Sequence, residues 1–428
     1  MSKVIKKKYT EEAHDGYNLR TAMEEASRCL LCEDAPCSKG CPAGTDPGKF
    51  IRSIRFRNVK GAAETIRENN ILGGVCARVC PYDRLCEEAC SRSGIDKPIH
   101  IGKLQRFAIE QEKAFGMKTL KAPAKAKAKV ACIGSGPASL ACAAKLATEG
   151  YKVTIFEEFD KAGGVLTYGI VPSRLPQSVV DHDIKMVKNL GVKFEFNTKV
   201  GRDITIDEIK KMGFKAIFVG TGLWDAKKVD IKGNDFDGVT TAVEFLKAAR
   251  TSGGSFDPGK EVIVIGGGDV AMDCAATAKL LGADKVTIVY RRTVEEAPAS
   301  INELKYVQSM GITIVTKFRP AEIVGKDGKV IGMMFDGTDG YSGLKLKADT
   351  VVFAIGQGAE DMSEVAPVKL TEKGTIAANV DKGKTSAAGI FAAGDIVNGG
   401  KTVVEAVAQG KAAADSIMDY LKKKEGVK

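Results

Sequence analysis

Two stretches of the chain share one order of apolar, small and polar positions. Residues 129–158 read KVACIGSGPASLACAAKLATEGYKVTIFEE, and residues 260–292 read KEVIVIGGGDVAMDCAATAKLLGADKVTIVYRR. Each begins with an apolar strand, turns at glycines, continues as an alanine-rich helix and ends in a second strand, which is the pattern of a βαβ unit. The glycine turns lie about 130 residues apart, too far for a solenoid repeat. The sequence therefore predicts two separate dinucleotide-binding folds.

The segments outside these units have other patterns. Residues 49–69, KFIRSIRFRNVKGAAETIREN, look helical, whereas residues 117–129, MKTLKAPAKAKAK, are low in complexity and typical of a linker. From residue 350 the chain returns to strand-like segments, TVVFAIGQG and GIFAAGDIV, and we expect a final helix near 402–422.

Composition narrows the class of protein. Hydrophobic residues make up 44% and charged residues 28% of the 428 residues, which is ordinary for a soluble globular protein. No apolar run is long enough for a membrane helix, and the start MSKVIKKKYTEEAHDG has no apolar segment after its lysines, so we expect a cytoplasmic protein without a membrane partner. The net charge of +10 comes from widely spread lysines without interleaved aromatic residues, which indicates a solvated surface rather than a nucleic-acid site.

The first glycine turn is typical of a nucleotide site. Its glycines, Gly134 and Gly136, allow the tight turn and the close approach of a pyrophosphate to a helix N-terminus, and Pro137 and Ala138 follow them. Ser139 replaces the third glycine of the usual pattern and is small enough to keep the helix close to the strand. Glu157 ends the second strand, where a ribose hydroxyl acceptor is expected.

The second turn runs from Gly266 through Gly268 to Asp269 and Val270, and we interpret Asp269 as a turn and helix-start residue. Its second strand is followed by Arg291 and Arg292 rather than by an acid. Arginines at this position suit a 2′-phosphate and favour NADP over NAD, and the alternative is two solvated surface arginines.

Eight of the eleven cysteines fall in two groups before residue 91. Their spacing is C-x2-C-x4-C-x3-C-P and then C-x3-C-P-x4-C-x3-C. A reducing cytoplasm disfavours disulfides, and zinc sites usually have paired CxxC spacings. The closing Cys-Pro is similar to that of bacterial ferredoxins, so we favour iron–sulfur clusters. Cysteine counting alone would use all eight thiols, Cys76 included. The other three, Cys132, Cys142 and Cys274, are expected to be buried apolar residues, and the scattered histidines form no metal or triad pattern.

Three later motifs carry a resemblance to a known family: the glycine pair in DKAGGVLTYG, the TGL at 221–223, and AAGDIVNGGKTVVEAV. With them the chain resembles the flavoproteins in which an FAD domain is interrupted by an NAD(P) domain. The resemblance implies that Asp395 lies against the FAD pyrophosphate and ribityl chain, and that the helix near Thr402 points its N-terminus at the isoalloxazine. Arg174 in SRLP matches a family arginine near the FAD. The implied FAD residues are Gly134, Gly136, Pro137, Ala138, Glu157, Gly164, Val165, Arg174, Val200, Gly222, Gly394, Asp395 and Thr402.

The N-terminal part carries a second resemblance, in EEASRCLLCEDAPCSKGCPAGTDPGKFIRSI, GAAETIRENN, GGVCARVCP and IGKLQRF within residues 24–107. It resembles the small flavin and iron–sulfur subunit of bacterial NAD(P)-dependent dihydropyrimidine dehydrogenases, which are related to the glutamate synthase small subunit. The resemblance leaves Cys76 unused and implies two [4Fe–4S] clusters. One is held by Cys29, Cys32, Cys37 and Cys90, and the other by Cys41, Cys80, Cys86 and Gln105.

The resemblance implies an electron-input subunit. It would pass electrons from NAD(P)H through FAD and the two clusters to an FMN-containing large subunit (PreA-like) that reduces uracil or thymine, and no side chain of this chain would act as a catalyst. The alternatives are a glutamate synthase small subunit, a ferredoxin-linked NAD(P)H oxidoreductase, and a zinc-bearing nucleotide-sensing or scaffold module without enzymatic activity. We expect an α/β protein with two Rossmann-like domains, the NAD(P) domain inserted in the FAD domain, after an α-helical iron–sulfur domain. The expected boundaries are 1–116 for the iron–sulfur domain, 117–129 for the linker, 130–225 and 349–428 for the FAD domain, and 226–348 for the NAD(P) domain.

Overall fold

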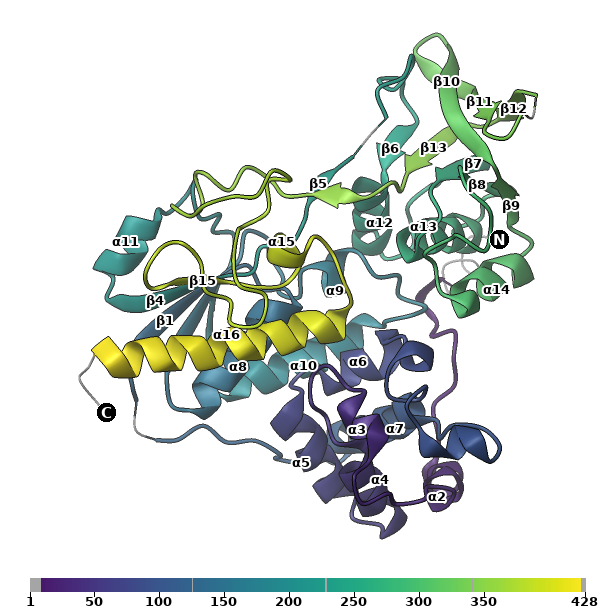
Figure 1. Ribbon diagram of the computed structural model, residues 1–428. Coiled ribbons are helices and arrows are strands. Elements are labelled where there is room, and N and C mark those ends of the chain that lie inside the picture. The colour runs from purple at the N-terminus through teal and green to yellow at the C-terminus, as the bar shows by residue number, and fades with distance from the viewer. Residues whose placement is uncertain (1–8, 125, 228, 341, 425–428) are drawn as a thin grey trace. The chain divides into compact units, whose positions relative to one another are not determined.

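The computed structural model describes residues 9–424 except 125, 228 and 341 (Figure 1). The first eight residues of the expected N-terminal domain, one linker residue and the last four residues of the chain therefore lie outside the described part. The chain divides into two compact units. The larger unit consists of His14–Thr167, Gln177–Leu223 and Ala359–Lys428, and the smaller unit of Met1–Ala13, Tyr168–Pro176 and Trp224–Gly358.

The larger unit begins with short helices around one apolar core. Residues 49–69 form two helices rather than one, because Arg57 has a φ of +60° and the side chain of Asn58 caps the second helix at Gly61 N. The buried core beneath them includes Phe50, Ile54 and Phe107. The elements are α2 (Leu19–Ser27), α3 (Pro36–Lys39), α4 (Pro47–Arg55), α5 (Val59–Asn69), α6 (Gly73–Val79), η1 (Tyr82–Arg84), η2 (Ser91–Gly94) and α7 (Ile101–Ala114).

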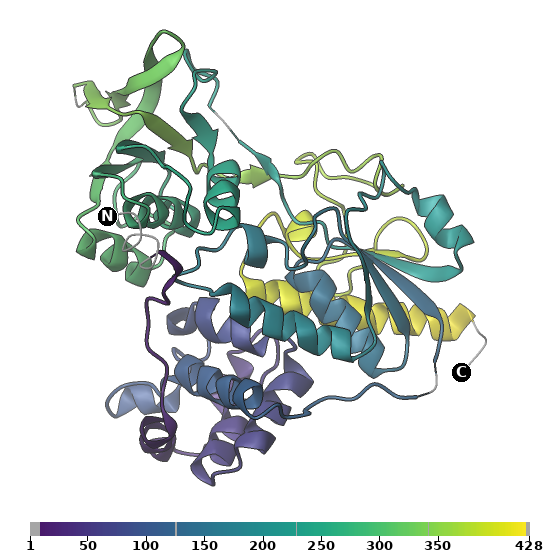
Figure 2. The ribbon, with the colours of Figure 1, turned by 180° about the vertical axis from the view of Figure 1, so that it is seen from behind.

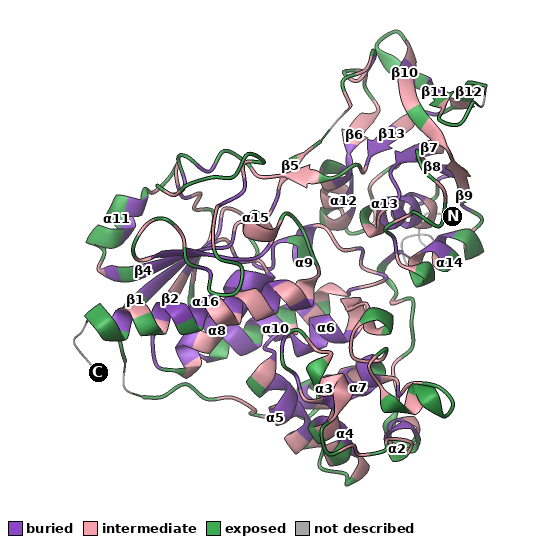
Figure 3. Cartoon of the chain, viewed as in Figure 1, coloured by how far each residue is buried: buried purple, intermediate pink, exposed green. Residues whose placement is uncertain are grey.

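The same unit contains a five-stranded sheet in the order β15-β4-β1-β2-β3, in which all neighbouring strands are parallel. Its strands are largely buried, as Figure 3 shows, and α8 and α16 lie side by side next to it (Figures 1 and 2). The strands are β1 (Lys129–Ile133), β2 (Lys152–Phe156), β3 (Lys193–Glu195), β4 (Phe214–Val219) and β15 (Ile390–Ala392). The helices are α8 (Pro137–Thr148), α9 (Val165–Tyr168), α10 (Gln177–Asn189), α11 (Ile206–Lys211), α15 (Asp395–Asn398) and α16 (Val403–Lys424).

A buried ion network joins the helical part of this unit to the sheet part. Arg67 on α5 pairs with Glu112 on α7 at 2.6 Å and with Asp183 on α10 at 2.7 Å, and all three side chains are fully buried. Asp183 also accepts a hydrogen bond from Val75 N at 2.9 Å. Burial raises the pKa of Glu112, but the hydrogen bond from His182 and the charge of Arg67 outweigh it and lower this pKa to about 2. The network therefore stays ionised at neutral pH and fixes α5, α7 and α10 against one another.

The smaller unit has a parallel sheet in the order β6-β13-β7-β8-β9 and an antiparallel sheet in the order β10-β11-β12. Strand β13 pairs between β6 and β7, so its residues belong to this sheet and not to the FAD segment 349–428 to which the sequence analysis assigned them. Tyr9 also lies in this unit, buried against Ala249 and Leu281.

The strands of the smaller unit are β5 (Asp225–Ala226), β6 (Val239–Thr241), β7 (Glu261–Ile265), β8 (Lys285–Tyr290), β9 (Thr313–Thr316), β10 (Phe318–Lys326), β11 (Lys329–Gly337), β12 (Leu344–Lys347), β13 (Thr350–Phe353) and β14 (Gln357–Gly358). Its helices are α12 (Ala242–Thr251), α13 (Asp269–Leu280) and α14 (Ile301–Ser309). Nowhere between residues 9 and 424, the undescribed positions aside, is a helix both long and apolar enough to cross a membrane.

We predict that Asp183→Asn destabilises the larger unit, because it leaves the buried Arg67 with one carboxylate fewer. Breaking a buried ion pair costs about 3–5 kcal/mol, which lowers the thermal midpoint by roughly 5–15 °C. Scanning calorimetry of the cofactor-loaded protein measures this. The control is Asp207→Asn, whose pair with Lys210 is at the surface, and whose midpoint should stay near that of the wild type. Equal midpoints for both variants would contradict the role of the network.

Candidate functional site

Glycines leave space around the first turn of α8 in the larger unit. Gly134 has a φ of +81°, and a Cβ there would lie 2.8 Å from the carbonyl oxygen of Gly220. Gly164 has a φ of +55°, and its Cβ would lie 3.0 Å from the Cα of Gly136. Gly136 is the N-cap of α8, and Pro137 is its first residue. Backbone segments thus meet at a helix N-terminus where no side chain fits, which is the arrangement that a pyrophosphate needs.

Glu157 lies beside this turn and is buried. Its carboxylate accepts hydrogen bonds from the backbone N–H and hydroxyl of Ser135 and from Phe159 N at 2.9 Å. Burial raises the pKa of Glu157 above its usual range, and the hydrogen bonds oppose that rise. Ser139 is fully buried, and a Cβ at Gly220 would lie 2.4 Å from its hydroxyl, so the helix and the loop after β4 pack closely here.

The late Gly-Asp turn closes on the same helix. Gly394 has a φ of +80°, and its Cβ would lie 2.9 Å from the Cβ of Ala138. Asp395 accepts a hydrogen bond from Lys401 N at 3.1 Å, and burial raises the pKa of its carboxyl. Thr402 directly precedes α16, and its hydroxyl donates to Glu405 at 2.7 Å. The structure therefore brings the residues at 134–138, 164 and 394 together around the N-terminus of α8.

The remaining residues predicted to bind FAD lie in different surroundings. Gly222 follows β4 with a φ of +76°, Val165 begins α9, and Val200 is in the buried core of the larger unit. Arg174 lies in the smaller unit instead, where its guanidinium pairs with Asp273 at 3.0 Å and Glu303 at 3.5 Å. Its FAD role stays a prediction.

The second glycine turn, in the smaller unit, is equally constrained. Gly266 has a φ of +148°, and its Cβ would lie 2.3 Å from the carbonyl oxygen of Ala354. Gly268 is the N-cap of α13, and Val270 on its first turn is partly exposed. Asp269 accepts a hydrogen bond from Ser300 N at 2.8 Å, so it ties the turn to the start of α14.

Arg291 and Arg292 follow β8, and both are exposed. Within the described ranges, neither guanidinium pairs with a carboxylate. Their charges are therefore available to an anion at the end of the strand that follows the second glycine turn.

The thiols of Cys29, Cys32, Cys37 and Cys90 lie near one another. Burial raises the pKa of Cys37 to about 11, with contributions from the charges of Cys90 and Cys29. Burial raises the pKa of Cys29 as well, and the charges of Cys90 and Cys32 add to the rise. Four thiols from two separate segments match in number and type the ligands that a [4Fe–4S] cluster needs, and their role as ligands stays a prediction.

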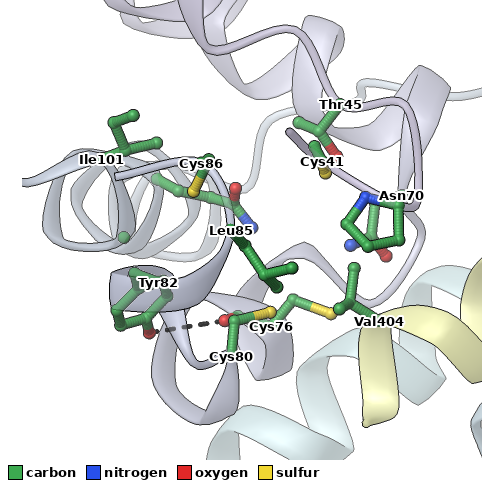
Figure 4. Close-up of a pocket in the computed structure, with 13 residues that line it drawn as sticks. Cys41, Thr45, Asn70, Cys76, Cys80, Tyr82, Leu85, Cys86, Ile101 and Val404 are labelled. Atoms are coloured by element: carbon green, nitrogen blue, oxygen red, sulfur yellow. Dashed lines mark hydrogen bonds between the residues drawn. The ribbon is translucent and has the colours of Figure 1, made fainter. Parts of the chain in front are cut away.

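A second set of thiols lines a pocket to which α7 also contributes residues (Figure 4). Cys41, Cys80 and Cys86 line it, together with Cys76 and Gln105. The Gln105 side chain is buried and its Nε2 donates to Gly73 O at 2.8 Å, so its amide oxygen is the atom that could serve as a metal ligand. Cys76 shares a hydrogen bond with Cys80 that raises the pKa of the Cys80 thiol. The pocket thus offers two candidates, Gln105 and Cys76, for the fourth ligand.

The pocket also has lining residues that the sequence analysis missed. The Thr45 hydroxyl is buried and has no hydrogen-bond partner among the described residues, so it is available to a cluster sulfur. The ring of Tyr82 lies over Gly102, where a Cβ would come within 2.5 Å of it, and Gly102 thereby lets α7 bring Gln105 to the pocket. Val404 lines the pocket from α16. These positions depend on contacts between distant segments, which no local pattern indicates.

Both sets of thiols have the chemistry of iron–sulfur cluster ligands. Within the described part, no three cysteine, histidine, aspartate or glutamate groups converge on one ion position. Ligands of a cluster bind different iron atoms and stand further apart than ligands of one zinc ion.

Comparison with known proteins agrees with this geometry. Residues 6–117 match the family model described as dihydropyrimidine dehydrogenase domain II, 4Fe-4S cluster, and residues 128–410 match the model of pyridine nucleotide-disulphide oxidoreductases. The PreT subunit of NAD-dependent dihydropyrimidine dehydrogenase from Escherichia coli K12 is 43% identical over 415 residues, covering 96% of this chain and 97% of the relative. The chain belongs to the PreT family.

More distant likenesses follow the same architecture. The small chain of NADPH glutamate synthase from Escherichia coli is 34% identical, covering 96% of this chain and 93% of the relative. Among solved structures, FprA of Mycobacterium tuberculosis in complex with NADPH covers 70% of this chain and 86% of its own, at 18% identity and a TM-score of 0.59, and it shows the fold alone. Like its PreT relatives, the chain is an oxidoreductase, with a 4Fe–4S cluster domain followed by an FAD- and NAD(P)-binding domain.

We predict that Gln105→Ala disturbs the iron–sulfur cluster in the thiol pocket and leaves the cluster at Cys29 nearly intact. The reason is that Gln105 lines the pocket, and its amide oxygen can act as a ligand while its Nε2 is hydrogen-bonded to Gly73 O. Iron and sulfide per flavin, with electron paramagnetic resonance of the reduced protein, measure the loss. Cys76→Ala is the matched control and should keep its iron. If Cys76→Ala loses one cluster while Gln105→Ala keeps all of its iron, the fourth ligand is Cys76 and the assignment to Gln105 is wrong.

Proposed function

We propose that the chain is the electron-input subunit of a dihydropyrimidine dehydrogenase. It takes electrons from NAD(P)H and passes them through FAD and two [4Fe–4S] clusters to an FMN-containing, PreA-like large subunit. That partner reduces uracil or thymine to the 5,6-dihydropyrimidine. The observation that carries the proposal is the pocket of thiols in contact with α16, the helix that starts next to the Gly394–Asp395 turn.

The order of the electron carriers rests on shared elements of the larger unit. Val404, the second residue of α16, lines the pocket of Cys41, Cys80 and Cys86, so the cluster in this pocket is the one next to α16. The charges of both Cys41 and Cys37 contribute to the raised pKa of Cys86, after burial as the largest cause. Cys37 belongs to the other thiol set. The second set is therefore adjacent both to α16 and to the first set, which supports the order flavin, pocket cluster, outer cluster.

The chain's own residues position the cofactors. A bound flavin accepts a hydride as an electron pair and releases the electrons singly, which suits one-electron clusters. The glycines at 134, 164 and 394 keep side chains out of the pyrophosphate site. Glu157 holds a buried carboxylate at the place of the ribose hydroxyls. Hydride transfer to a flavin needs no protein acid or base, so we assign no catalytic side chain.

The names of the relatives support the proposal of a partner subunit and of a pyrimidine substrate. The PreT relatives are named as subunits of an enzyme. The alignment covers 96% of this chain and 97% of each relative, so the similarity extends over nearly the whole of such a subunit. We therefore assign the pyrimidine site and its proton donor to the FMN-containing partner.

Co-purification of the native complex tests this function. We expect mass spectrometry to identify an FMN-containing large subunit, and the complex to oxidise NADPH or NADH when uracil is added. Oxidation that depends on glutamine plus 2-oxoglutarate instead would identify a glutamate synthase small subunit. Purified protein without a flavin absorbance band, holding stoichiometric zinc, would rule out an electron-transfer role and favour a nucleotide-sensing or scaffold module.

We predict that Arg291→Ala with Arg292→Ala lowers kcat/KM for NADPH by about 10–100-fold, because hydrogen bonds to a charged group contribute about 1.5–3 kcal/mol. The value for NADH should change little, since NADH has no 2′-phosphate. Steady-state reduction of an artificial acceptor measures both. Arg319→Ala, which removes an exposed arginine of the same unit, is the control and should change neither value. Equal losses of kcat/KM with NADPH and NADH would contradict the assignment of the two arginines to a 2′-phosphate. That result would agree with the names of the relatives, which are NAD-dependent.

A further inference from the structure

Helix α16 presents two neighbouring residues to two different parts of the larger unit. Gly410 lies against the first turn of α8, where a Cβ would come within 2.2 Å of the carbonyl oxygen of Ala138. Lys411, the next residue, turns to the helical domain instead. Its Nζ donates to Ala43 O at 2.7 Å and to Asn69 O at 2.6 Å. One side chain thus bonds two segments of the iron–sulfur domain to the helix that begins beside the FAD turn.

Both carbonyls belong to segments whose neighbouring residues line the thiol pocket. Ala43 stands two residues after Cys41, on the segment that continues to Thr45, and Asn69 is the last residue of α5, directly before Asn70. Figure 4 shows Cys41, Thr45 and Asn70 on one side of the pocket and Val404 of α16 below them. Val404 and Lys411 are seven residues apart, so they lie on one face of the helix. That face sets the position of the pocket relative to α16.

The ammonium group of Lys411 is close to a predicted cluster ligand. The charged and titratable groups that act on it are Lys145, Cys41 and Asp415. No carboxylate lies within ion-pair distance of Lys411 in the part of the chain that the structure describes. Its charge therefore acts on Cys41 without a neutralising partner in contact with it. A cluster bound by thiolates becomes more negative when it is reduced, so a nearby cation favours the reduced state and raises the reduction potential.

We propose that Lys411 is a positioning residue that holds the Cys41–Thr45 segment against α16 and raises the reduction potential of the cluster in the thiol pocket. The proposal rests on the proposed function only in that this pocket holds a [4Fe–4S] cluster. Lys411 provides a positive charge that makes electron transfer from the flavin to this cluster more favourable. Neither the thiols nor the glycine turns provide such a charge.

The test uses three variants of the full chain, purified anaerobically with their cofactors. Lys411→Met removes the charge and both hydrogen bonds, Lys411→Gln keeps a donor without the charge, and Lys411→Arg keeps the charge. Lys422→Met removes a lysine from the exposed last turn of the same helix and is the matched control. Redox titration followed by electron paramagnetic resonance gives the potential of each cluster, and rapid mixing with NADPH gives the rates of flavin and cluster reduction.

We expect Lys411→Met and Lys411→Gln to lower the potential of one cluster only and to slow its reduction at least tenfold, with flavin reduction unchanged. Lys411→Arg and Lys422→Met should match the wild type. Unchanged potentials of both clusters in Lys411→Gln would overturn the electrostatic role, and so would equal shifts of both clusters. If Lys411→Met does not retain its clusters, Lys411→Gln and Lys411→Arg decide the result. Wild-type protein that contains no cluster would instead refute the proposed function, so the two failures are distinguishable.

Discussion

The backbone contact between α8 and α16 is the constraint on which the site depends. At Gly410 the two helices approach so closely that a single methyl group would collide with the carbonyl oxygen of Ala138. This approach places the start of α16 beside the turn that begins at Gly394, whose Cβ would likewise meet Ala138. A helix held at this distance can face a dinucleotide site with one turn and a thiol pocket with another. Gly410 and Gly394 therefore contribute to the site by permitting this close packing, although neither has a side chain that could bind a ligand.

A second constraint is the cost of buried charge at the junction of the helical and sheet parts. Arg67, Glu112 and Asp183 come from three helices, and each is fully buried. Removing any one leaves an unbalanced charge in a low-dielectric interior, so the network stabilises only the arrangement in which all three helices are in place. Lys411 adds a further connection, from α16 to the helical part that carries the cysteines. The polar contacts thus specify where the cluster pocket sits, while apolar packing supplies the bulk of the stability.

The sequence predicted the local parts of the fold well, because βαβ units and glycine turns are determined by a few neighbouring residues. It predicted the fold class and the family correctly. It did not predict the break at Arg57, which needs a positive φ that no composition rule requires there. It placed β13 with the wrong sheet, since strand order depends on pairing between segments far apart in the chain. The roles of Thr45 and Lys411 were missed for the same reason: each becomes visible only when the segments around the pocket are assembled.

The central claim is that one chain holds a flavin together with two iron–sulfur clusters. The most direct measurement is an anaerobic reductive titration of the purified chain with dithionite, followed by absorbance and electron paramagnetic resonance. The account predicts that full reduction takes about four electrons per FAD, two for the flavin and one for each cluster, with two resonance signals in the reduced state. Complete reduction by about two electrons, with no signal from a reduced cluster, would contradict it.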